Sequence, residues 1–139
     1  VRCVVEWSKK VPASERGPRA SRSVFLSTHE PCCMCVSAIV WAGFERVYYL
    51  FPYADTASQG IPHDIRVMHE LWGVGSYRKR NAYCATAGLM DLIDSLPDDD
   101  GDKEELMERR GRLTEAYERL SGKYHAEKGG NENNSLVLG

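Results

Sequence analysis

Long apolar runs are missing from this sequence of 139 residues: no stretch is long enough to span a bilayer, and no signal peptide is recognisable. We therefore expect no membrane partner and a cytoplasmic location. A strong charge of one sign is missing as well, because 18 Lys and Arg residues against 20 Asp and Glu residues leave a net charge of −2. No global field then draws in nucleic acid or an anionic membrane.

Two local clusters of basic residues remain, at 78–80 and at 109–112. We interpret both as solvated helix faces rather than as binding surfaces. A nucleic-acid partner therefore stays open but is not favoured over a small-molecule substrate.

An even number of cysteines, as a disulfide framework would have, is also missing. The chain has five, and two of them, Cys32 and Cys35, have a spacing typical of metal ligands. Without a signal peptide, an odd cysteine count favours a reducing compartment and thiolate chemistry over a disulfide framework.

The hydrophobic pattern predicts a βαβ unit in the first half of the chain. Residues 23–28 and 46–51 are short apolar runs typical of buried strands. Residues 32–42 lie between a proline and Gly43, as in a helix with a marked start and stop. Elsewhere the patterns predict helices over 1–7, 62–72, 81–96 and 102–124, and loops over 8–22, 52–60 and 98–102. We expect one domain over residues 1–124 and a flexible tail over residues 125–139.

The Pro-Cys-x-x-Cys element at residues 31–35 carries the most chemical information. Residues i and i+3 lie on one face of a helix, so Cys32 and Cys35 can reach one metal ion, while Cys33 points elsewhere. The start of a helix also favours the thiolate form that binds metal. Zinc is the favoured interpretation; a redox pair and inert buried thiols are the alternatives.

The segment 27–39, Ser-Thr-His-Glu-Pro-Cys-Cys-Met-Cys-Val-Ser-Ala-Ile, resembles the second zinc motif of the cytidine and deoxycytidylate deaminase superfamily. The continuation 41–49, with a small residue and glycine before a strand, is similar too. The resemblance implies a three-layer α/β/α fold with a mixed, largely parallel sheet, of which the N-terminal strands are missing from this chain. It also implies a Zn²⁺ cofactor held by Cys32 and Cys35, and a homo-oligomer.

The activity that the resemblance implies is zinc-dependent hydrolytic deamination of a cytosine- or purine-type base, nucleoside or nucleotide. One alternative is a non-catalytic deaminase-like zinc domain that acts as a structural or partner-binding subunit. Another is RNA editing of the kind performed by tRNA adenosine deaminases.

The third zinc ligand and the proton-shuttling Glu of this family lie in a His-x-Glu motif, which we expect upstream of Val1. The catalytic residue is therefore unknown, and we expect the chain alone to be inactive. His125-Ala126-Glu127 has the same pattern, but it lies at the wrong end of the chain and we interpret it as a chance match.

Three residues are candidates for the substrate pocket: His29, Glu30 and Trp41. Each has a second interpretation: His29 as a cap of the turn, Glu30 as an anchor of the start of the following helix, and Trp41 as core. We expect Cys3 and Cys84 to be small buried hydrophobes.

Overall fold

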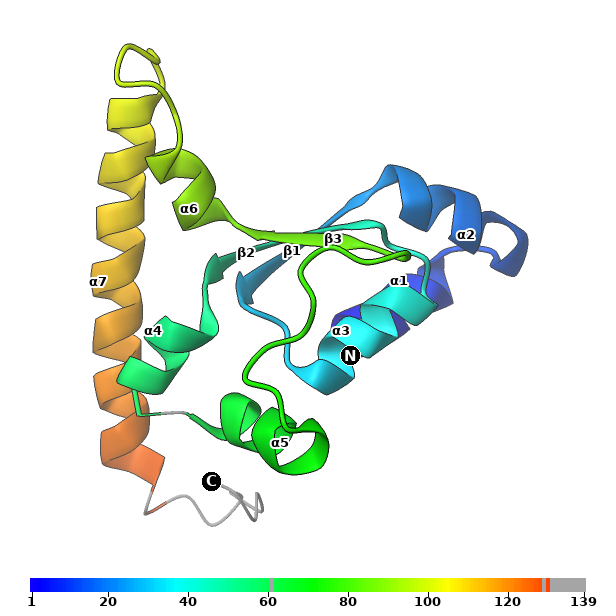
Figure 1. The fold of residues 1–139 in the computed structure, drawn as a ribbon, viewed down its shortest axis with the longest axis horizontal. Helices are drawn as coiled ribbons and strands as arrows, with labels where there is room; N and C mark the ends of the chain where they lie inside the picture. Colours follow the sequence, from blue (N-terminus) through cyan, green and yellow to red (C-terminus); the bar gives the residue numbers. More distant parts are fainter. Residues whose placement is uncertain (61, 129, 131–139) are drawn as a thin grey trace. The chain divides into compact units, whose positions relative to one another are not determined.

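The computed structural model of the chain describes residues 1–60, 62–128 and 130. These residues form three strands and seven helices (Figure 1). In chain order they are α1 (Arg2–Lys10), α2 (Ala13–Arg22), β1 (Val24–His29), α3 (Cys33–Trp41), β2 (Arg46–Phe51), α4 (Tyr53–Ser58), α5 (His63–Trp72), β3 (Ala85–Gly88), α6 (Leu89–Asp94) and α7 (Lys103–Lys128).

The contacts between residues divide the chain into two compact units, Val1–Leu92 and Ile93–Gly139. The single domain expected over 1–124 stays a prediction. Helix α7 continues through Lys128, so the first four residues of the expected tail 125–139 are helical. Residues 129 and 131–139 of that tail lie outside the described residues.

The sheet of the first unit has the order β1-β2-β3, and all three described strands are parallel (Figure 1). Phe25 pairs with Val47, and Val47 pairs in turn with Thr86. The central strand β2 buries every second residue and leaves the residues between them partly exposed, whereas its continuous apolar run predicts a strand covered on both faces. The predicted α/β fold is confirmed, including the βαβ unit formed by β1, α3 and β2.

The core of the first unit lies where α2, α3 and the first two strands meet. Its buried residues are Ala20, Ile39, Phe44 and Val47. The ring of Phe44 lies 5.0 Å from that of Trp7 and 5.3 Å from that of Phe25, measured between centroids. The predicted helix over residues 1–7 is confirmed as α1, and its Val4 and Trp7 cover this core.

The loop predicted over residues 8–22 is wrong, because α2 occupies most of it. Gly17 and Pro18 indicate a loop when only local propensity is considered. In the structure Ala20 has no exposed surface and packs in the core, and this tertiary contact outweighs the unfavourable local residues. Gly43 lies beside this residue with a φ of +90°, a backbone conformation that favours glycine, whereas a Cβ there would make only an ordinary contact with the Cβ of Ala20 at 3.5 Å.

Two further segments differ from their predictions. The predicted loop 52–60 contains α4, and the predicted helix 81–96 contains β3 followed by α6. The sequence Ala-Thr-Ala-Gly of β3 has small residues that fit a helical pattern equally well. In the structure this segment pairs with β2, and the Ala85 N–H donates a hydrogen bond to the carbonyl oxygen of Glu45 at 2.8 Å. These backbone contacts make the segment a strand.

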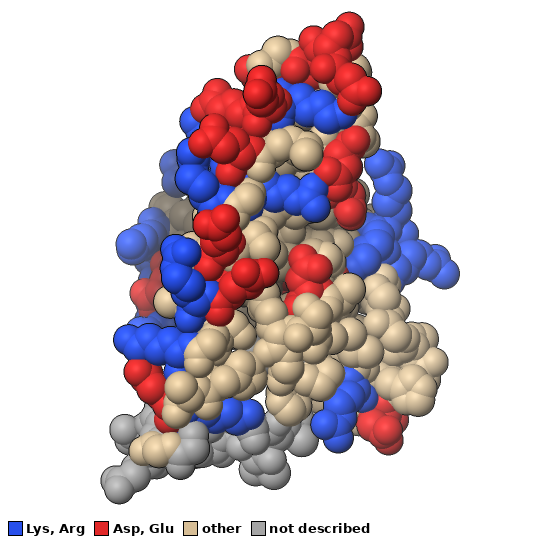
Figure 2. Space-filling model, turned by 90° about the vertical axis from the view of Figure 1, so that its left-hand side faces the viewer, with Lys and Arg blue, Asp and Glu red and all other residues tan. Residues whose placement is uncertain are grey.

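The second unit is dominated by the charged surface of α7. Figure 2 shows Lys and Arg side chains alternating with Asp and Glu side chains on this face. Each arginine of the cluster 109–112 pairs with a carboxylate: Arg109 with Glu105, Arg110 with Asp94, and Arg112 with Glu108. Exposed pairs of this kind contribute only about 0.3–0.5 kcal/mol each. Their arrangement is that of the solvated helix face expected from the sequence.

No helix in the described ranges is both long enough and apolar enough to cross a membrane.

Candidate metal site

The Pro-Cys-x-x-Cys element lies between the carboxyl end of β1 and the start of α3. Cys32 is the N-cap of α3, and Cys35 lies in the first turn of the helix. Open α/β sheets place their ligands at the carboxyl ends of the strands. Both thiols line a cavity of about 500 Å³, whereas Cys33 is not among its lining residues. The expectation that Cys32 and Cys35 share one side of the helix is consistent with this arrangement.

The two thiols interact with each other. Burial raises the pKa of the Cys32 thiol to about 11, the backbone N–H of Cys35 opposes this rise, and the Cys35 thiol adds to it. The terminal amine of Val1 lies 3.6 Å from the Sγ of Cys35. A metal ion that binds here must displace the thiol protons, so its binding releases protons.

Cysteine sulfurs, which bind metals as thiolates, suit zinc, a borderline-soft cation whose structural sites in proteins use two to four cysteine ligands. Cys32 and Cys35 are therefore chemically fit to supply two ligands of a tetrahedral site. Among residues 1–60, 62–128 and 130, no group of three or more His, Cys, Asp and Glu side chains lies close enough to hold one ion. A zinc ion bound here would thus take a pair of ligands from the described side chains.

Two residues of the cavity wall were not expected from the sequence. Cys3, predicted to be buried, is exposed and lines the cavity, since in α1 it lies about 100° around the helix axis from its neighbour Val4, which packs against the core. Asp64, in the first turn of α5, lines the cavity as well, and burial raises the pKa of its carboxyl group. Only the acidic first turn after Pro62 signalled it in the sequence. Cys84 is buried, as predicted.

His29 lies at the end of β1 and lines the same cavity. Burial lowers the pKa of its imidazole, and the negative charge of Asp55 opposes this effect. Its ring lies 5.2 Å from that of Phe51, the residue that pairs with it on β2. His29 is thus placed where the sequence predicts a pocket residue, although its role stays a prediction.

Glu30 is buried, and its carboxylate contacts protein groups on both sides. One oxygen, Oε1, forms an ion pair with the Nζ of Lys79, and Oε2 accepts a hydrogen bond from the Tyr53 N–H at 3.1 Å. The hydroxyl of Tyr53 donates to the carbonyl oxygen of Pro31 at 2.6 Å. These contacts anchor the turn that precedes α3, which is the second of the two roles expected for Glu30.

The ammonium group of Lys79 is enclosed by three tyrosine rings. It lies 4.3 Å from the ring centroid of Tyr77, 5.3 Å from that of Tyr49 and 5.6 Å from that of Tyr53. Burial and the negative charge of Glu30 raise the pKa of all three phenols, that of Tyr49 to about 12. Lys79 therefore belongs to a partly buried cluster around Glu30, and its charge is paired there rather than free as in a solvated basic patch.

Trp41 does not line the cysteine cavity and is not core. It lies at the C-terminal end of α3 with 91% of its surface exposed, and it lines a second hollow on the other side of that helix. Phe44, the neighbouring aromatic, is the core residue of the two. His125 and Glu127 belong to α7, in the second unit.

The comparisons with known proteins agree with the site. Residues 9–51 match the family model of the cytidine and deoxycytidylate deaminase zinc-binding region, which supports Zn²⁺ as the cofactor. The matched residues include α2, β1, α3 and β2, and thus both cysteines of the cavity. No curated protein and no solved structure matches the chain.

Proposed function

We propose that this chain, whose residues 9–51 match the zinc-binding region of the cytidine and deoxycytidylate deaminases, serves zinc-dependent hydrolytic deamination. The substrate is a cytosine- or purine-type base, free or as its nucleoside or nucleotide. The reaction breaks an exocyclic C–N bond with water and releases ammonia.

One observation carries the proposal: the two thiols of Pro-Cys-x-x-Cys open onto a cavity of about 500 Å³ at the carboxyl end of a parallel strand. Ligand pockets for small molecules have volumes of roughly 300–1,000 Å³. A base or nucleoside therefore fits beside a metal held at Cys32 and Cys35.

Zinc at this position supplies Lewis-acid activation of water, whose pKa falls to about 7 when it is bound. The chain's own residues hold and shape the site. Cys32 and Cys35 bind the ion, and Glu30 with Tyr53 holds the turn that carries them. Asp64 and His29 provide titratable groups on the cavity wall, within reach of a bound ring.

The second candidate is a non-catalytic zinc domain that stabilises the fold or binds a partner. The contacts of Glu30 favour it, because the carboxylate nearest the cysteines in the sequence is already bound to Lys79 and Tyr53 and is not free to carry protons. In this case the cysteines bind zinc, but no substrate is converted.

The test measures ammonia release by the protein expressed from its complete open reading frame. The substrates are cytosine, adenine and guanine with their nucleosides and monophosphates. We expect release by the wild type and by Cys33→Ala, and none by Cys32→Ala. If the wild type binds zinc but releases no ammonia from any member of the panel, the enzymatic proposal fails and the structural zinc domain stands.

A further inference from the structure

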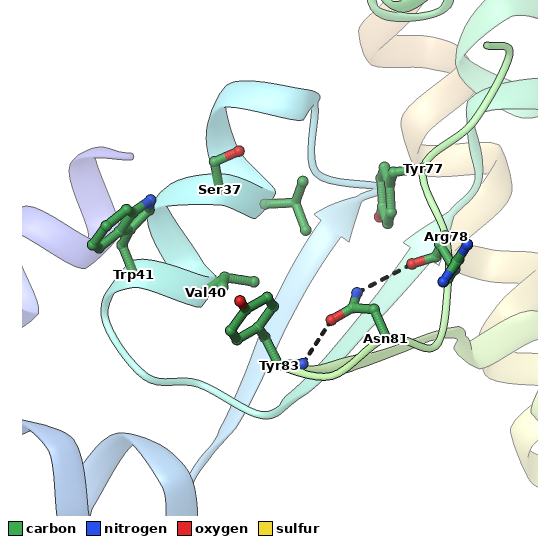
Figure 3. A pocket seen from close by; sticks show the side chains of 8 residues that line it. Ser37, Val40, Trp41, Tyr77, Arg78, Asn81 and Tyr83 are labelled. Carbon is green, nitrogen blue, oxygen red and sulfur yellow. Dashed lines mark hydrogen bonds between the residues drawn. The ribbon is translucent and has the colours of Figure 1, made fainter. Parts of the chain in front are cut away.

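A second hollow lies on the side of α3 that faces away from the cysteine cavity. Its volume is about 220 Å³ (Figure 3). One wall comes from α3 and the other from the segment that leads into β3. Its lining residues are Val36, Ser37, Val40, Trp41, Tyr77, Arg78, Asn81 and Tyr83.

This hollow, which we call the aromatic groove, shares no lining residue with the cysteine cavity. The cavity is lined by α3 residues 32, 35 and 39, and the groove by residues 36, 37 and 40. Positions three and four apart lie on one face of a helix, so the two sets mark two sides of α3. The groove is therefore a separate site, and it requires no metal.

Two large aromatic rings are exposed at the groove. Trp41 is 91% exposed and Tyr83 is 72% exposed, one on each wall (Figure 3). Rings with this exposure offer open faces on which a flat ligand can stack. They also leave the hollow too open to enclose a small molecule on all sides.

The wall that carries Tyr83 is rigidly built. The side chain of Asn81 donates from Nδ2 to the carbonyl oxygen of Arg78 at 3.3 Å, and its Oδ1 accepts from the N–H groups of Tyr83 (2.8 Å) and Cys84 (3.0 Å). Figure 3 shows Asn81 between Arg78 and Tyr83. The backbone at Arg78 and Tyr83 is thus ordered before any ligand arrives, which lowers the entropic cost of binding.

Of the eight residues that line the groove, Arg78 alone is charged. Residues 71–90 contain Arg78, Lys79 and Arg80 but no Asp or Glu, and residues 31–44 contain no charged residue at all. Lys79 is engaged by Glu30. Arg78 and Arg80 are exposed, and within the part of the chain that the structure describes neither forms an ion pair. The groove therefore combines stacking surfaces with uncompensated positive charge.

From this combination we infer that the aromatic groove binds single-stranded nucleic acid, with bases stacked on Trp41 and Tyr83 and phosphates near Arg78 and Arg80. Proteins that bind single strands use this pairing of exposed aromatic rings with a basic track. A second copy of the chain fits the charge less well, because a symmetric contact would bring the same arginines together. The inference goes beyond the proposed deamination and does not depend on it.

The experiment uses the purified chain without zinc and a fluorescein-labelled RNA of mixed sequence, about 15 nucleotides long. Binding is measured by fluorescence anisotropy over a range of salt concentrations, with the corresponding DNA strand and a double-stranded RNA as further probes. We expect the single strands to bind more tightly than the duplex. We also expect the affinity to fall as the salt concentration rises, because phosphate contacts release counterions.

Four variants locate the binding. Trp41→Ala and Tyr83→Ala each lower the affinity at least about fivefold, the factor that corresponds to the loss of one weak stack. Arg78→Gln reduces the slope of log affinity against log salt by about 0.7, as expected for one lost contact to a single strand. Trp72→Ala is the matched control, since Trp72 is 59% exposed on α5 and does not line the groove. It keeps the wild-type affinity.

Three results would overturn the inference. The first is an affinity that Trp41→Ala leaves unchanged. The second is a free mononucleotide that binds as tightly as the strand, which would make the groove a small-molecule site. The third is a dimer of the wild-type chain that Trp41→Ala dissociates, without oligonucleotide binding by either form. None of these measurements involves zinc or ammonia release, so a failure here is distinct from a failure of the proposed deamination.

Discussion

The side chain of Lys79 forms an ion pair with the carboxylate of Glu30, which precedes it by 49 positions in the chain. The Glu30 side chain is 3% exposed and that of Lys79 is 38% exposed, so the carboxylate is the desolvated partner. The pair connects the turn before the cysteines to the segment that forms one wall of the aromatic groove. It is therefore the contact on which both described sites depend.

We predict that Lys79→Met lowers the free energy of unfolding by about 3 kcal/mol, because it leaves a buried carboxylate without its counter-charge. Urea unfolding of the metal-free chain measures this loss. Adding Glu30→Gln to Lys79→Met should recover part of it, since the double variant has no buried charge. A loss below about 1 kcal/mol in Lys79→Met would show that Glu30 is adequately solvated without its partner.

The hydroxyl of Tyr53 makes the second anchor of the same turn, through the carbonyl oxygen of Pro31. We predict that Tyr53→Phe costs about 1–2 kcal/mol of stability, because a buried carbonyl group loses its donor. Thermal or urea unfolding measures the cost. Tyr83→Phe is the matched control at an exposed tyrosine, and we expect it to leave stability within about 0.5 kcal/mol of the wild type.

Burial raises the pKa of Tyr49 from 10.0 to about 12, with Glu30 and Asp91 adding to the shift. An acid whose pKa is raised in the folded state stays neutral there while the unfolded chain ionises. The contribution of Tyr49 to the free energy of unfolding should therefore be constant below about pH 10 and fall as the pH rises towards about 12. Tyr49→Phe should make this alkaline decline less steep. Urea unfolding across that window checks the prediction, and an unchanged slope in Tyr49→Phe would contradict it.

Two glycines that lie close together, Gly17 and Gly43, should respond to alanine in opposite ways. Gly43 has a φ of +90°, so we predict that Gly43→Ala destabilises the chain by about 1–2 kcal/mol. Gly17 lies inside α2, and a Cβ there meets nothing within 4 Å. Gly17→Ala should therefore stabilise it by about 0.5–1 kcal/mol. The melting temperatures of the two variants test this prediction, and they should shift in opposite directions.

The cysteines allow a direct test of the metal pair. We predict that the metal content per chain falls in Cys32→Ala and in Cys35→Ala, because each removes one of two ligands. Cys33→Ala should keep the wild-type content, since Cys33 does not line the cavity. Elemental analysis after dialysis against trace zinc measures all three. Equal zinc in Cys32→Ala and the wild type would remove Cys32 as a ligand.

The βαβ unit of β1, α3 and β2 could be predicted because its signals are local. Each strand is a compact apolar run, and a glycine with positive φ ends α3 as expected. The loop predicted in place of α2 shows the limit of such signals. Its local residues oppose a helix, and the burial of Ala20 against residues far along the chain decides the outcome.

The metal pair itself could be predicted from its spacing, whereas its surroundings could not. Asp64 and Cys3 reach the cavity from α5 and α1, and no spacing in the sequence links either of them to Cys32. The surroundings of Lys79 could not be predicted from the sequence either. Three adjacent basic residues indicate a solvated surface, and only the fold brings Glu30 and three tyrosines around the middle one.

Helix α3 is the shared wall of the cysteine cavity and the aromatic groove. A helix of nine residues moves as one body, so a rotation that adjusts Cys35 to an ion also shifts Val36 and Val40 on the opposite side. If such a rotation accompanies binding, the two sites are thermodynamically linked. A factor by which zinc changes the affinity of the groove for its ligand is then also the factor by which that ligand changes the affinity of the chain for zinc.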